Sequence, residues 1–193
     1  MQDGTPGVAA SAPAAVALSD LEAFERVIQQ HKQRIYTYIC RLTNRSPEAE
    51  DLTQEVFVRA FKSMRAFRHD AQVDTWLYRI ATNLVIDRKR REKRAPRWVS
   101  VDDEESEAHR LESTAPQSRP QEALETRELQ AQVQAAVHSL PTKLRLAAVL
   151  CDLEGLSYQE AAEALGCPVG TIKSRLFHAR ALLKRKLRPY LEQ

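Results

Sequence analysis

Side chains suited to contacting nucleic acid recur at helical spacing close to the C-terminus. On a helix running from Val169 to about residue 187 they share one face, which carries Lys173, Ser174, Phe177, His178 and Lys184. The opposite face carries an apolar stripe of Ile172, Leu176, Ala179, Leu183 and Leu187. A phenylalanine on a basic face needs a partner, and the methyl groups of thymine in a major groove would provide one. The pattern predicts a helix that reads duplex DNA.

A shorter helix pattern precedes this one and would position it. Ser157 and Glu160 form an S-x-x-E capping box, which fixes a helix start. An apolar stripe follows, formed by Tyr158, Ala161, Ala162 and Leu165. Gly166 can end the first helix in the left-handed conformation, and Pro168 suits the first turn of the next. Residues 156–187 therefore predict a helix-turn-helix with the recognition helix starting at Val169.

The composition limits the class of protein. With 193 residues and 43% hydrophobic content, the chain can form one ordinary domain or two small ones. Cys40, Cys151 and Cys167 are far apart and are interpreted as packing or turn residues. The five histidines are scattered singly, and the sequence has no nucleophile elbow, phosphate-binding glycine loop or metal-ligand spacing. We therefore expect no catalytic residue, no metal, no cofactor and no small-molecule substrate.

Composition also divides the chain. Residues 1–18 are rich in Ala, Gly, Pro and Ser without periodicity, and they are interpreted as a disordered tail. They lack the features of a signal peptide, which predicts a cytoplasmic protein without membrane insertion. Residues 95–122 contain several prolines and an acidic run, and they are interpreted as a flexible linker. The prediction is an all-α fold with two small helical domains, at 19–94 and 123–193.

The first domain is expected to contain three helices. A capping box at Ser19 and Glu22 would open the first, and Ser46 would cap the second. The second helix, through about Met64, has a polar face formed by Asp51, Gln54, Glu55, Val58 and Lys62. An acidic face with an apolar centre suits a basic protein better than DNA, although a simply solvated face is the alternative.

The third helix, capped by Asp74 or Thr75 and running to about Arg94, has a different strip beside its core stripe. The strip carries Trp76, Arg79, Asn83, Asp87 and Arg90. Unpaired bases stack on aromatic rings while arginines hold phosphates, so the strip suits single-stranded DNA. Trp76 could equally be a packing residue. The basic run at residues 88–94 would then contact phosphates.

Three stretches together resemble the extracytoplasmic-function (ECF) sigma factors of the sigma-70 superfamily. They are DLTQEVFVRAF at 51–61, FRHDAQVDTWLYRIATNLVIDRKRR at 67–91 and LSYQEAAEALGCPVGTIKSRLFHARALLKRKL at 156–187. The resemblance covers essentially everything after residue 20. It implies a transcription factor, not an enzyme, that binds core RNA polymerase and recognises the −35 and −10 promoter elements. It also implies the start of transcription of a stress or envelope-response gene set, under control of an anti-sigma factor.

The resemblance also assigns a role to each face. The polymerase-docking residues would be Asp51, Gln54, Glu55 and Val58. The −10 residues would be Arg68, Asp70, Thr75, Trp76, Arg79, Asn83 and Arg90. In such factors the loop at 67–75 captures a flipped base, and Asn83 occupies the matching position for contacting it.

In the helix-turn-helix at residues 157–177 and just beyond it, the resemblance assigns the −35 residues. They would be Thr171, Lys173, Ser174, Arg175, Phe177, His178 and Arg180. Arg175 and Arg180 are better placed for phosphates than for bases. His178 departs from the family, since many relatives carry arginine there, so its contact would weaken as the imidazole loses charge at high pH.

Two other functions compete with this interpretation. A stand-alone transcriptional regulator could use the same helix-turn-helix without polymerase, but it would leave the Trp76–Asn83 strip and the Val58 face unexplained. A nucleic-acid-processing enzyme would need a catalytic group, and the sequence offers no candidate.

Overall fold

The computed structural model describes residues 12–43, 46–64, 72–94 and 120–191, and every regular element within them is helical. The elements are α1 (Ala12–Thr43), α2 (Ser46–Ser63), α3 (Val73–Arg94), α4 (Pro120–His138), α5 (Thr142–Ala148), the π-helical turn η2 (Val149–Leu153), α6 (Tyr158–Leu165) and α7 (Val169–Leu191). The all-α prediction is confirmed. Among the described helices, none has both the length and the apolarity that a membrane crossing requires.

Helices α1, α2 and α3 pack against one another around apolar side chains. Tyr38 and Tyr78 lie edge to face at the centre, with ring centroids 4.9 Å apart. The hydroxyl of Tyr38 shares a 2.7 Å hydrogen bond with that of Thr82, and both residues are buried. A buried hydroxyl pair satisfied in this way fixes the register of α1 against α3.

Two helix starts differ from the sequence predictions. Helix α1 begins at Ala12, so Ser19 lies inside the helix and does not cap it. The reason is the alanine-rich stretch before it, because alanine has the highest helix propensity. Helix α4 begins at Pro120, within the predicted linker, with proline in a first turn where its missing N–H costs nothing. The rest of the predicted tail and linker, residues 1–11 and 95–119, lies outside the described residues.

The second part of the chain comprises α4 to α7. Pro141 separates α4 from α5, and α5 continues into η2, which ends shortly before Gly155. Gly155 has a φ of 77°, which favours glycine. Leu129 is separated from Val133 and Ala136 by helical spacing, but it is 48% exposed.

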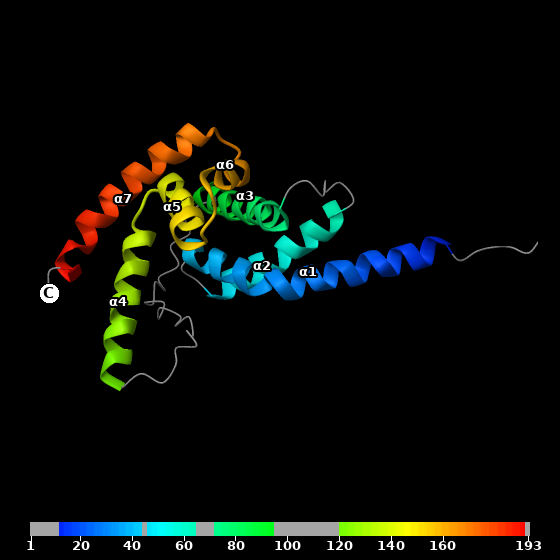
Figure 1. The fold of residues 1–193 in the computed structure, drawn as a ribbon, viewed down its shortest axis with the longest axis horizontal. Coiled ribbons are helices and arrows are strands. Elements are labelled where there is room, and N and C mark those ends of the chain that lie inside the picture. The colour runs from blue at the N-terminus through cyan, green and yellow to red at the C-terminus, as the bar shows by residue number, and fades with distance from the viewer. Residues whose placement is uncertain (1–11, 44–45, 65–71, 95–119, 192–193) are drawn as a thin grey trace, which may run out of the picture.

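The two parts are packed against each other. Helix α3 lies against α6, and the C-terminal end of α1 lies against α4 and η2, as Figure 1 shows. A single buried cluster includes Tyr78 and Leu84 of α3 together with Ala161 of α6 and Ile172 of α7. The sequence predicted two domains on a flexible linker and gave no indication of this contact.

Candidate nucleic-acid interface

The helix-turn-helix begins with the predicted capping box. The amide of Glu160 donates to Ser157 Oγ (3.2 Å), and the amide of Ser157 donates to Glu160 Oε2 (2.7 Å). Hydrogen bonding of its carboxylate to the side chain and to the backbone amide of Ser157 lowers the pKa of Glu160, because it favours the charged form. The start of α6 is therefore fixed by two side chains three positions apart in the sequence.

The turn between α6 and α7 is also as predicted. Gly166 adopts the left-handed conformation, with φ 59° and ψ 44°. The amide of Cys167 donates to the carbonyl of Ala162 at 3.0 Å, and the carbonyl of Pro168 accepts from the amide of Thr171 at 2.9 Å. These bonds satisfy backbone groups at both helix ends and set the direction in which α7 leaves the turn.

Helix α7 presents the expected two faces. Ile172, Leu176 and Ala179 are buried. The exposed face carries Lys173, Ser174, Phe177, His178 and Lys184. Phe177 is 71% exposed, and its ring lies edge-on to that of His178, with centroids 5.5 Å apart. The placement of these side chains is confirmed, while their contact with DNA stays a prediction.

An open hollow of about 450 Å³ lies on this face. It is lined by Tyr158, Lys173, Leu176, Phe177, Arg180, Ala181 and Lys184. Tyr158 was predicted to be buried in the stripe of α6, but it is 38% exposed. The reason is its place in the first turn of α6, where its ring lines the hollow instead of the core. The hollow combines aromatic and aliphatic walls with three cationic side chains.

The remaining predicted −35 residues are partly buried or make contacts within the protein. Arg180 holds Asp152 of η2 through two contacts, Nη2 to Oδ1 at 2.6 Å and Nε to Oδ2 at 3.2 Å. These hydrogen bonds raise the pKa of Arg180. Arg175 is half-buried, with Nη1 3.6 Å from the sulfur of Cys167, and Thr171 is also half-buried. Arg180 can contact a phosphate only in competition with Asp152.

Only part of the predicted strip on α3 forms an exposed surface. Arg79, Asn83 and Arg90 are exposed, while Trp76 is half-buried and packs against the core cluster. Arg90 Nη1 lies 3.8 Å from Asp87 Oδ1. The predicted −10 residue Thr75 is only 4% exposed, so its side chain does not join this surface. Arg68 and Asp70 lie outside the described residues.

Asp74 does not cap α3, which begins one residue earlier at Val73. Its carboxylate lies 2.6 Å from Nδ1 of His31 and accepts from Arg34 Nη1 at 2.7 Å. Both partners belong to α1, so these polar contacts link the first turn of α3 to α1. An acid at a helix N-terminus also interacts favourably with the helix dipole.

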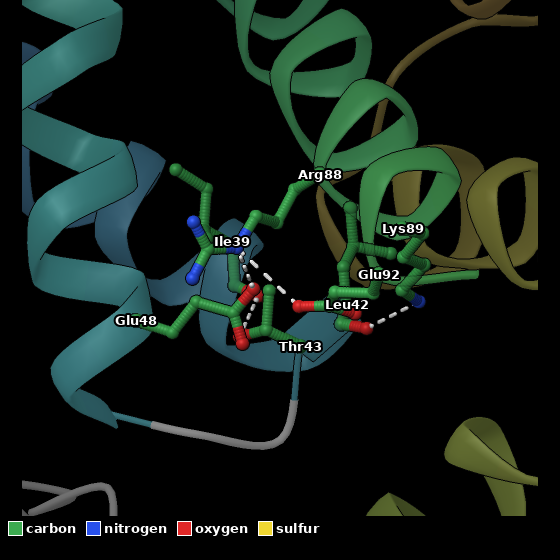
Figure 2. Close-up of polar contacts among 7 residues, drawn as sticks. All are labelled: Ile39, Leu42, Thr43, Glu48, Arg88, Lys89 and Glu92. Carbon is green, nitrogen blue, oxygen red and sulfur yellow. Dashed lines mark hydrogen bonds and ion pairs between the residues drawn. The ribbon is translucent and has the colours of Figure 1, made fainter. Parts of the chain in front are cut away.

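Two residues of the basic run at the end of α3 make polar contacts within the protein. Arg88 Nε lies 3.7 Å from Glu48 and 3.3 Å from Glu92, and Lys89 donates to the carbonyl of Leu42 at 3.0 Å (Figure 2). The last contact satisfies a free carbonyl at the C-terminal end of α1. Arg90, Arg91 and Arg94 of the same run are exposed, and contact of the run with phosphates stays a prediction.

The acidic face of α2 is accessible. Asp51 and Gln54 are exposed, and Val58 is 45% exposed. Glu55 is partly buried and accepts from Arg59 Nε at 2.7 Å, one helical turn away. An exposed valine between carboxylates is the kind of apolar centre that the sequence predicted for a protein-docking face.

The described residues offer little for metal binding or for thiol chemistry. Within the described segments, no three His, Cys, Asp or Glu residues gather in a way that could hold a metal ion. The three cysteines are unpaired and half-buried, and burial raises the pKa of Cys40 and, to about 11, that of Cys151.

Sequence reasoning missed one polar cluster, at the seam between the two parts of the chain. The side chain of Glu154, just after η2, is only 6% exposed. It accepts from Arg41 Nη1 of α1 at 2.5 Å and from the hydroxyl of Tyr78 of α3 at 2.8 Å. Arg145 of α5 donates to the carbonyl of Leu42 at 3.1 Å. An isolated glutamate before a glycine carries no sequence signal for burial, because its partners are far away along the chain.

Comparison with known proteins agrees with this architecture. Residues 27–95 match the family model of sigma-70 region 2, and residues 130–183 match that of sigma-70 region 4. The ECF RNA polymerase sigma factor SigE of Mycolicibacterium smegmatis is 37% identical over 171 residues, which cover 89% of this chain and 62% of that protein. The RNA polymerase sigma-H factor of Pseudomonas aeruginosa is 34% identical over 178 residues, covering 90% of this chain and 91% of that protein.

Solved structures give the same result. The sigma factor RpoE of Bartonella quintana, solved in complex with the anti-sigma factor NepR, has a TM-score of 0.66 and 26% identity, covering 86% of this chain and 98% of that chain. CnrH, solved with the cytosolic domain of CnrY, shares the fold, with a TM-score of 0.63 and 24% identity over 91% of this chain and 94% of that one. With its two sigma-70 regions in order and a sigma factor at 34% identity matched over 91% of its length, the chain belongs to the ECF sigma factors of the sigma-70 family.

Proposed function

We propose that this sigma factor docks on core RNA polymerase through the α2 face and reads a two-part promoter with α3 and α7. The observation that carries the proposal is the exposed Phe177 among cations on the recognition helix. Most of the ring of Phe177, which is 71% exposed, faces water in the free protein, so a ligand with an apolar contact point explains its position.

Helix α7 would read the −35 element as duplex. Lysines at 173 and 184 are exposed on either side of the ring of Phe177, along the same face. They would hold phosphates while the ring contacts a base edge, and the residues near the start of a recognition helix are the ones that reach bases. The hollow beside Phe177 leaves room for the methyl group of thymine, which projects into the major groove.

Helix α3 would read the −10 element after melting. Trp76 offers a ring, Arg79 a phosphate contact and Asn83 an amide that can pair with a base edge. Stacking one base on an aromatic ring contributes about 1–3 kcal/mol, comparable with the few kcal/mol that unstacking costs. Captured bases would therefore stabilise the open strand.

The face of α2 would bind the polymerase. Its carboxylates at Asp51 and Glu55 repel DNA, whereas a protein surface with basic side chains around an apolar site would complement Val58. The family assignment makes the chain an initiation factor, not an enzyme, and the bond-forming chemistry belongs to the polymerase.

The family assignment also bears on how this sigma factor is controlled and where in the cell it works. RpoE of Bartonella quintana was solved in complex with NepR, an anti-sigma factor. We propose that an anti-sigma factor also restrains this chain, and that it works in the cytoplasm, where polymerase and promoter DNA meet. The gene set that it serves would be a stress or envelope response.

In vitro transcription tests the proposal. Core polymerase free of other sigma factors, mixed with the full chain and fragmented genomic DNA of the source organism, should initiate at sites that share a two-part sequence. Asn83→Ala should reduce initiation at those sites, and Lys173→Ala should weaken protection upstream. Binding to duplex DNA without any initiation would instead favour the stand-alone regulator.

A further inference from the structure

Two residues of α1 hold the first turn of α3 from one side. His31 and Arg34 are three positions apart on α1, so they lie on the same face of that helix. Nδ1 of His31 lies 2.6 Å from Oδ1 of Asp74, and Arg34 Nη1 donates to Oδ2 at 2.7 Å. Contacts of this kind, in which a charged group takes part, are stronger than hydrogen bonds between neutral groups. Both oxygens of the Asp74 carboxylate are therefore engaged by α1, and its side chain is only 30% exposed.

Arg34 also contacts the next turn of α3. Its guanidinium carbon lies 5.9 Å from the centre of the Tyr78 ring, within the range of a cation–π contact. Asp74 and Tyr78 are four positions apart, so a single arginine bridges the first two turns of the helix. Because Tyr78 is fully buried, this bridge connects the start of α3 to a part of the helix that packing already fixes.

The first turn of α3 has little helical stability of its own. It is formed by Val73, Asp74, Thr75 and Trp76, and all four residue types have a lower helix propensity than alanine or the unbranched side chains. The first amides of a helix also lack partners within it. The position of this turn therefore depends on its tertiary contacts, which are the buried side chain of Thr75 and the engaged carboxylate of Asp74.

The predicted −10 strip lies on the opposite side of α3 from Asp74. At about 100° per residue, Trp76, Arg79 and Asn83 lie roughly 140–200° around the helix from Asp74. The aspartate therefore faces α1 and not the strand that the strip would bind. Trp76 shares the first turn with Asp74, whereas Asn83 lies more than two turns further along.

We propose that Asp74, held by His31 and Arg34, is a positioning residue for the capture of unpaired −10 bases and that it acts through Trp76. The inference rests on the proposed function. The contacts with α1 fix the first turn on one side, so that the ring of Trp76 on the other side stays aligned with the rest of the strip. Without them the first turn would adopt other positions as well, and a stacking base would have to order it on binding. Asn83, in the packed part of the helix, would keep its own contact.

Binding of holoenzyme to an unpaired −10 strand tests the role of Asp74. The holoenzyme is assembled from core polymerase and the full chain. The probe is a promoter fork, taken from a promoter that initiates in vitro, whose non-template −10 strand is unpaired and carries 2-aminopurine in place of one adenine. Asp74→Asn keeps the size of the side chain and removes its charge. It should weaken binding about five-fold or more, within the roughly 5- to 150-fold that the loss of one stacked base costs.

Three comparisons accompany this measurement. Asp74→Asn should also reduce the quenching of bound 2-aminopurine, which reports stacking independently of affinity. Asp74→Glu restores a carboxylate and should regain most of the affinity, while Arg34→Gln should weaken binding as Asp74→Asn does. Glu25→Gln, which removes an exposed carboxylate of α1, is the matched control and should leave binding unchanged. The affinity for core polymerase should be the same in all of these variants.

Two double-mutant cycles separate positioning from general structural damage. Asp74→Asn should weaken binding little further in a Trp76→Ala background, because the residue through which it acts is already missing. In an Asn83→Ala background it should weaken binding by its full factor. Circular dichroism checks that each variant is folded. If Trp76→Ala does not fold, the Asn83 cycle and the 2-aminopurine signal carry the test.

Three results would overturn the inference. Asp74→Asn could behave like Glu25→Gln, it could weaken binding of core polymerase by the same factor as binding of the strand, or its loss could add fully to that of Trp76→Ala. Each would leave the proposed function standing, provided that wild-type holoenzyme initiates and Asn83→Ala weakens binding of the strand. If wild-type holoenzyme neither initiates nor binds the strand, the proposed function fails and the inference fails with it.

Discussion

Phe177→Ala offers the sharpest test of how α7 reads DNA, because stability and binding should respond differently. The ring is 71% exposed, so less than a third of it is buried, and full burial of such a side chain contributes about 1.5–3 kcal/mol. Truncation should therefore lower the free energy of unfolding by less than about 1 kcal/mol. Its neighbour Leu176 is 1% exposed, and Leu176→Ala should cost about 2–5 kcal/mol. Urea unfolding followed by circular dichroism measures both.

In promoter binding by folded protein, Phe177→Ala should have a larger effect than Leu176→Ala. If the ring of Phe177 contacts a thymine methyl group, its loss should weaken occupancy of the −35 element by about 1–3 kcal/mol, or about 5- to 150-fold. The assay is promoter binding by holoenzyme on templates with thymine or with uracil in that element, since uracil lacks only the methyl group. Phe177→Ala should lose affinity on thymine templates and lose little on uracil ones. Equal losses on both templates would refute the methyl contact, and an unfolding cost above about 1.5 kcal/mol would show that Phe177 is a core residue.

Three further outcomes are expected. Val58→Glu should weaken binding to core polymerase while the helical content stays intact, because Val58 is 45% exposed; unchanged affinity in a pull-down titration would reject the docking face. Burial, followed by the charges of Arg145 and Lys89, lowers the pKa of His138 to about 4, below its unfolded value of about 6.5. The unfolded chain then binds more protons between these values, so stability should fall by up to about 3 kcal/mol as the pH drops from about 6.5 to 4, and His138→Gln should flatten that slope in urea titrations. Ser157→Ala should cost about 0.5–2 kcal/mol in the same assay by removing the cap of α6, and a smaller loss would mean that packing alone sets that helix start.

The helix-turn-helix could be predicted almost completely, because its determinants are local. Ser157 and Glu160 satisfy each other's backbone groups within one turn, and Gly166 adopts a conformation that few other residues tolerate. Such signals lie within a few residues of the structure that they specify. The same holds for the exposed face of α7, where helical periodicity alone placed Phe177 outward.

Contacts that depend on distant residues could not be predicted. Glu154 meets Arg41 across 113 positions of sequence, and Asp74, which looked like a helix cap, is held by His31 and Arg34. Periodicity indicates which side chains are buried but not which part of the chain buries them. The predicted start at Ser19 failed for a local reason, since the alanine-rich stretch before it continues the helix.

The apolar cluster shared by α3 and α6 has a consequence for any form of the molecule in which these two helices separate. When α3 and α6 separate, side chains such as Leu84 and Ala161 that are now buried together would face water, at a cost of about 25 cal/mol for each Å² of apolar surface. A molecule in which α3 and α6 had separated would therefore expose apolar surface and be prone to collapse or to associate with other chains. Its lifetime depends on what covers those surfaces, and a large assembly that receives both halves at once would keep it soluble.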